Sequence, residues 1–142
     1  MTSGLLLFNL RLVGVFMAAL VVVNVFVPRH LRWREDLRRV SLVNRQIFEV
    51  HAIFLVVILA MFAVLLLSSS EALLEPSRLS RLLLGGLTIF WGLRMLAQWF
   101  YYSPDTWRGD RLRTAVHYAF SLAWIYVTAV FGMAFGWITI LR

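Results

Sequence analysis

Four long runs of apolar residues organise the sequence, and three shorter polar connections separate them. The apolar runs cover about residues 5–27, 47–67, 82–100 and 114–140. A helix crosses a bilayer core with about 20 apolar residues, so each run predicts one transmembrane helix. Helices also satisfy every backbone polar group without water, as lipid requires. The pattern therefore predicts an all-α, four-helix transmembrane bundle, and its short connections favour an up-down topology.

The three prolines, Pro28, Pro76 and Pro104, all fall in predicted connections. Proline ends helices because it lacks an N–H and clashes with the preceding turn. The first run is long and is followed by Pro28 instead of a small-residue cleavage site, so it predicts a span and not a cleaved signal peptide. The composition shows no second regime, which predicts a single integral membrane domain over residues 1–142.

The first connection, residues 28–46, alternates apolar and basic residues. Leu31, Trp33, Leu37 and Val40 are separated by arginines at loosely helical spacing. This pattern predicts a short amphipathic segment on the membrane surface, with its arginines near phospholipid headgroups. A solvated basic loop is the alternative.

The net charge is +7, and the 14 basic residues are all arginine. Because basic short connections stay in the cytoplasm, both termini are predicted to be extracytoplasmic in a bacterial inner membrane. Charges in such connections favour anionic lipid headgroups over nucleic acid as partners. The absence of cysteine excludes thiolate catalysis, disulfides and cysteine-bound metal. Basic residues gather in the first connection (Arg29, Arg32, Arg34, Arg38, Arg39, Arg45) and the third (Arg108, Arg111, Arg113), whereas the second has only Arg78 and Arg81.

Polar residues inside the four runs fall at one predicted depth, near the cytoplasmic face. Equal offsets from the same membrane face give equal depth, because a helix rises about 1.5 Å per residue. Ionisable groups in a bilayer are costly, so each is a candidate for function. The residues of this layer are Asn24, Glu49, His51, Arg94, Gln98 and His117.

Helical phase limits how these residues combine. Arg94 and Gln98 share one face of the third span, whereas Glu49 and His51 point to opposite sides of the second. A guanidinium cannot shed its proton and needs an anion, and Glu49 is the default partner as the one acidic residue inside the spans. The alternative is an anion clamp for a lipid phosphate, a haem propionate or a substrate carboxylate. The predicted ligand-binding residues are Arg94, Gln98, Glu49 and Asn44.

The two histidines of the layer predict a second possibility. His51 and His117 lie at equal depth on spans that run in the same direction, so they could hold a b-type haem iron between them. A metal site is a weaker interpretation, since zinc or iron would want three or more convergent ligands. The structural interpretation is that each histidine makes a hydrogen bond between helices.

The favoured function is a non-enzymatic, multi-pass binding or assembly subunit. Its polar layer would hold an anionic lipid or a quinone-like molecule, and its partners would be membrane lipids, a membrane-protein subunit or a second copy of the chain. The alternatives are a bis-histidine haem electron carrier and a small lipid-modifying enzyme, in which Glu49 or a histidine would act as acid or base. No nucleophile motif, phosphate-binding loop or HExxH motif accompanies them.

Three stretches of the sequence carry a resemblance. They are residues 43–48 leading to His51, residues 90–94 leading to Gln98 and Trp99, and residues 126–132. Together they resemble small four-span bacterial membrane proteins. The resemblance implies a four-span fold, and no activity comes with it.

Overall fold

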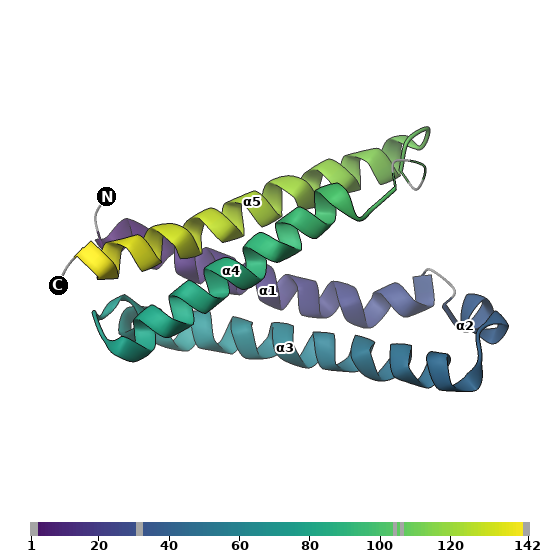
Figure 1. The fold of residues 1–142 in the computed structure, drawn as a ribbon, viewed down its shortest axis with the longest axis horizontal. Helices are drawn as coiled ribbons and strands as arrows, with labels where there is room; N and C mark the ends of the chain where they lie inside the picture. The colour runs from purple at the N-terminus through teal and green to yellow at the C-terminus, as the bar shows by residue number, and fades with distance from the viewer. Residues whose placement is uncertain (1–2, 31–32, 104, 106, 141–142) are drawn as a thin grey trace. The chain divides into compact units, whose positions relative to one another are not determined.

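A computed structural model describes residues 3–30, 33–103, 105 and 107–140, and the described residues are almost entirely helical (Figure 1). Four long helices are apolar enough to cross a membrane, which confirms the predicted all-α, four-helix fold. They are α1 (Ser3–His30), α3 (Leu42–Leu74), α4 (Arg78–Phe100) and α5 (Arg111–Ile140), and the short α2 (Trp33–Asp36) and η1 (Leu37–Arg39) lie between the first two.

The helices extend beyond the apolar runs at several ends, because polar residues continue the helical structure. Helix α1 runs through Pro28 to His30, so the prediction that Pro28 lies in a connection is wrong. A proline near the end of a helix removes one backbone hydrogen bond and strains only the turn before it. Pro76 does separate α3 from α4, and Pro104 lies outside the described residues.

Polar side chains cap the N-termini of two of the long helices. The Ser77 hydroxyl accepts a hydrogen bond from the backbone N–H of Ser80 at the start of α4. One carboxylate oxygen of Asp110 accepts from the N–H groups of Leu112 and Arg113 at 2.8 and 3.1 Å. Such caps satisfy donors that a helix start leaves unpaired, so α5 begins three residues before the apolar run does.

The first connection forms two short turns, α2 and η1, instead of one continuous amphipathic helix. Trp33 of α2 packs edge-on against Phe48 of α3, with 4.8 Å between ring centroids. Contact with a membrane surface stays a prediction for this segment.

The chain divides into two compact units: residues 1–9 with 71–142, and residues 10–70. The division falls beside Ser69, whose backbone (φ −130°, ψ 15°) breaks the helical geometry of α3. That residues 1–142 form a single domain stays a prediction.

In the unit of residues 71–142, one face of α5 is buried at intervals of three and four residues. It contains Trp124, Val127, Val130, Phe131, Ala134 and Ile138. This spacing is the stripe expected where a helix packs against a neighbour. The buried residues of α4 include Leu84, Leu87 and Trp91.

Gly14 of α1 lies against α3 with little free space beside it. A Cβ added to Gly14 would lie 3.0 Å from Leu66 Cβ and 3.0 Å from Leu67 Cγ. Small residues at such positions let membrane helices pack backbone to backbone.

Replacing Gly14 with alanine is expected to destabilise the protein by about 1–3 kcal/mol, because the extra methyl group overfills the α1–α3 contact. Thermal unfolding in detergent, followed by circular dichroism, measures the loss. Gly86→Ala is the matched control, because a Cβ at Gly86 meets nothing within 4 Å. Equal stabilities of the two variants would contradict close packing at Gly14.

Candidate functional site

Arg94, Gln98 and His117 form one hydrogen-bonded chain between α4 and α5, here named the α4–α5 polar cluster. Arg94 Nη1 donates to Gln98 Oε1 at 3.2 Å. The Gln98 amide nitrogen lies 3.1 Å from His117 Nδ1. Gln98 is buried, and the other two side chains are partly exposed. The faces predicted from helical phase therefore meet in the structure.

Donor and acceptor rules fix how this chain is protonated. A guanidinium can only donate, so Gln98 must turn its oxygen to Arg94 and its NH₂ group to His117. His117 Nδ1 then accepts with its lone pair, which places the ring hydrogen on Nε2 of a neutral imidazole. In the other unit, His51 Nδ1 lies 2.7 Å from the carbonyl oxygen of Ile47 and must donate to it. The Nδ1 atoms of the two histidines therefore have opposite roles, as an acceptor in His117 and as a donor in His51.

Aromatic rings surround the α4–α5 polar cluster. The Arg94 guanidinium carbon lies 4.8 Å from the ring centroid of Trp124 and 5.9 Å from that of Tyr102. Trp107 stacks on His117, with 4.4 Å between centroids and 8° between planes. The sequence analysis did not identify Tyr102 and Trp107 as residues of this site. Both lie at or beyond the end of α4, where helical periodicity gives no signal.

Arg94 keeps its positive charge without an anionic partner in the described part of its unit. Its contacts there are the neutral amide of Gln98 and two aromatic faces. A guanidinium has five N–H donors, and the Gln98 bond uses one of them. The remaining donors suit a phosphate or carboxylate, which a guanidinium binds through two parallel hydrogen bonds.

Glu49, the predicted partner of Arg94, belongs to the other unit, so the ion pair stays a prediction. Asn44 lies in the first turn of α3 with an exposed side chain, and its backbone N–H donates to Ser41 Oγ.

The haem interpretation also stays a prediction, and the tautomers set a condition for it. An iron needs a ring nitrogen with a free lone pair. His51 Nε2 has one, whereas His117 uses its lone pair on Gln98. Axial ligation by His117 would therefore require loss of the Gln98 hydrogen bond. The described residues contain no cluster of three His, Asp or Glu side chains that could hold a metal ion.

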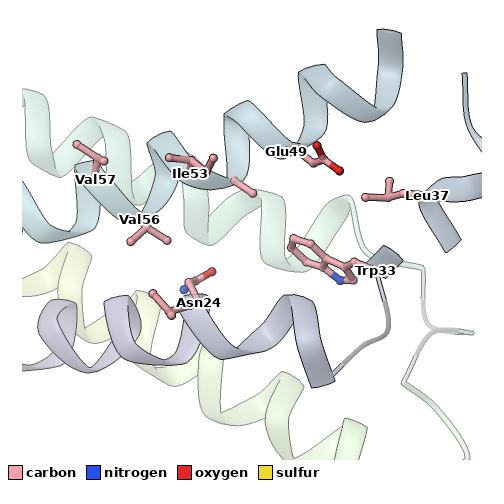
Figure 2. Close-up of a pocket in the computed structure, with 9 residues that line it drawn as sticks. Asn24, Trp33, Leu37, Glu49, Ile53, Val56 and Val57 are labelled. Atoms are coloured by element: carbon pink, nitrogen blue, oxygen red, sulfur yellow. The ribbon is translucent and has the colours of Figure 1, made fainter. Parts of the chain in front are cut away.

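A pocket of about 530 Å³ lies between α1 and α3 within residues 10–70 and is here named the α1–α3 pocket (Figure 2). Asn24 of α1 and Glu49 of α3 are its polar residues, and Trp33 adds an aromatic wall. Thus two residues of the predicted polar layer, on different helices, line one cavity. The remaining lining residues are Val25, Leu37, Ala52, Ile53, Val56 and Val57.

The tautomers are directly measurable. In protein labelled with ¹⁵N at histidine, we expect His117 to show an unprotonated Nδ1 and His51 an unprotonated Nε2. Histidine-to-asparagine variants at each position assign the signals. In Gln98→Leu, the His117 preference for the Nε2–H form is expected to weaken and that of His51 to persist. A wild-type His117 protonated at Nδ1 would contradict the hydrogen-bonded chain described here.

Comparison with protein-family models, with curated proteins and with solved structures finds no match for this chain. The function is therefore inferred from the geometry of the residues.

Proposed function

We propose that this multi-pass membrane protein is a non-enzymatic binding protein that holds the phosphate group of an anionic lipid at Arg94. The supporting observation is a permanent charge whose partners, among the described residues of its unit, are all neutral. Gln98 and the ring of Trp124 hold the guanidinium in place. Because the guanidinium is already fixed, it loses little conformational entropy when it binds a phosphate through its planar pair of N–H donors.

The charge around the cluster supports a lipid as the source of the phosphate. Arg108, Arg111 and Arg113 lie in the connection to α5 and in its first turn, at the end of the two helices where the cluster lies. Basic residues beside a span attract anionic headgroups, each contributing about 1 kcal/mol. By the arginine bias, this end belongs to the cytoplasmic leaflet of a bacterial inner membrane.

A quinone-like ligand is the second candidate, because neutral His117 offers an Nε2–H donor to a carbonyl oxygen. A lipid-modifying enzyme has less support at this cluster. Arg94 cannot transfer a proton, and the His117 lone pair that would act as a base is used by Gln98.

The first experiment measures which lipid the purified protein retains. Native mass spectrometry of detergent-solubilised protein is performed with equal amounts of phosphatidylglycerol and phosphatidylcholine. We expect phosphatidylglycerol to bind about tenfold more tightly, a difference of about 1.4 kcal/mol. Phosphatidylcholine carries the same phosphate, but its choline adds a positive charge that the arginines beside the cluster repel. We also expect this preference to weaken with salt.

Equal binding of the two lipids would contradict the proposal. A parallel sample contains a benzoquinone with an isoprenoid tail. Displacement of phosphatidylglycerol by that quinone would favour the second candidate.

A further inference from the structure

The α1–α3 pocket differs chemically from the α4–α5 polar cluster. Its walls are mainly aliphatic, and its volume of about 530 Å³ falls in the range of sites for small molecules or parts of a lipid. Its polar groups come from opposite sides, Asn24 from α1 and Glu49 from α3 (Figure 2).

Both polar groups present hydrogen-bond acceptors. Asn24 Nδ2 donates to the backbone carbonyl of Leu20 at 2.8 Å, and the side-chain oxygen lies on the pocket side of the amide (Figure 2). Glu49 offers a carboxylate, and an ionised carboxylate only accepts. The Trp33 ring in the wall presents a π face, which also attracts cations. The complement of this pocket is therefore a cationic group with several N–H donors.

Arginines close in sequence to the lining residues limit which cationic ligand the pocket can bind. Arg45 precedes Glu49 by about one turn of α3, and Arg38 and Arg39 are exposed in η1. A purely cationic ligand would be repelled by these side chains. A headgroup with an ammonium next to a phosphate would meet Glu49 with its positive end and the arginines with its negative end.

We infer that the α1–α3 pocket binds an aminophospholipid of the phosphatidylethanolamine class, with its ammonium at Glu49 and Asn24. The phosphate lies toward Arg45 and the arginines of η1, and an acyl chain lies along Ile53, Val56 and Val57. The primary ammonium is essential to this inference, because it has three N–H groups and can donate to both Asn24 and Glu49. A trimethylammonium group carries the same charge and has no N–H to donate.

The test compares phosphatidylethanolamine with phosphatidylcholine of identical acyl chains on the full-length protein in detergent, by native mass spectrometry. We expect a preference of about tenfold for phosphatidylethanolamine, as a charge-assisted hydrogen bond would give. We expect Glu49→Gln to reduce this preference to below about twofold, since a neutral amide loses the charge that strengthens that bond. Glu75→Gln is the matched control, because Glu75 is an exposed acidic residue between α3 and α4.

Two further variants test whether the pocket itself binds the lipid. Ala52→Leu narrows the pocket without changing a charge, and we expect it to lower phosphatidylethanolamine binding as well. Arg94→Gln is expected to leave the preference unchanged, because no residue of the α4–α5 polar cluster lines the pocket. Equal binding of the two lipids by the wild type, or a full preference in Glu49→Gln, would overturn the inference. Displacement of the lipid by free ethanolamine at equal concentration would overturn its assignment to a lipid.

Discussion

Replacing Trp124 with alanine is expected to lower the free energy of unfolding by about 3 kcal/mol, as loss of a large buried aromatic side chain does. Trp124 is 4% exposed. Its ring stacks on Trp91 at 5.1 Å and 15° and also contacts Phe120 at 5.8 Å. Lipid solvates apolar side chains well, so most of this loss comes from van der Waals packing and not from the hydrophobic effect. We expect the two helices to separate more easily near the α4–α5 polar cluster.

The same substitution at an exposed tryptophan controls for the loss of the ring itself. Trp99 on α4 is 47% exposed, and Trp99→Ala is expected to change the free energy of unfolding by about 0.5 kcal/mol or less. Titration with a denaturing detergent, followed by circular dichroism, measures both variants. Trp124→Phe is expected to recover part of the loss. Similar losses for Trp124→Ala and Trp99→Ala would show that the stacked rings do not hold α4 to α5.

Replacing Arg94 with glutamine is expected to weaken binding of phosphatidylglycerol about 10–100-fold while leaving the folded state at least as stable. The affinity falls because the variant loses charge-assisted hydrogen bonds to the phosphate, each contributing about 1.5–3 kcal/mol. Stability is retained because a cation with neutral partners is costly in an apolar environment. Function and stability are thus expected to change in opposite directions, as they do at many binding sites.

Two other variants separate geometry from charge. Arg94→Lys keeps the charge and loses the planar fork, so intermediate affinity is expected. Arg113→Gln also removes one arginine, but that side chain is 70% exposed and pairs with Asp110 at 3.5 Å. It should therefore weaken lipid binding by about fivefold at most, which is the roughly 1 kcal/mol of one arginine beside a span. If Arg94→Gln kept its lipid and unfolded more easily, Arg94 would be a structural residue.

The apolar runs were sufficient to predict the four long helices, because helix length in a bilayer depends mainly on composition. The exact helix ends depended on local side chains that hydropathy does not measure. Asp110 caps α5 before its apolar run begins, and α1 continues through Pro28. The short turns α2 and η1 replaced the continuous segment predicted for the first connection.

The α4–α5 polar cluster was partly predictable, since helical phase placed Arg94 with Gln98 on one face and the depth of His117 matched theirs. That Gln98 would link Arg94 to His117 required the packing of two helices. The stacking of Trp107 on His117 depends on the path of a connection, which has no periodicity to detect. The pairing predicted between Glu49 and Arg94 depends on how two helices are placed relative to each other, and sequence periodicity carries no such information.

The unequal lengths of the long helices have a consequence for where the protein can work. Helix α3 has 33 residues, interrupted at Ser69, and α4 has 23. At about 1.5 Å per residue, α4 is roughly 35 Å long. Arg94 lies in the last two turns of α4, roughly 9 Å from its end. Hydrocarbon thickness differs by a few ångströms between membranes, and spans adjust to it by tilting. The level of the phosphates relative to Arg94 therefore changes with acyl-chain length, and this protein should bind its lipid best in bilayers of one thickness.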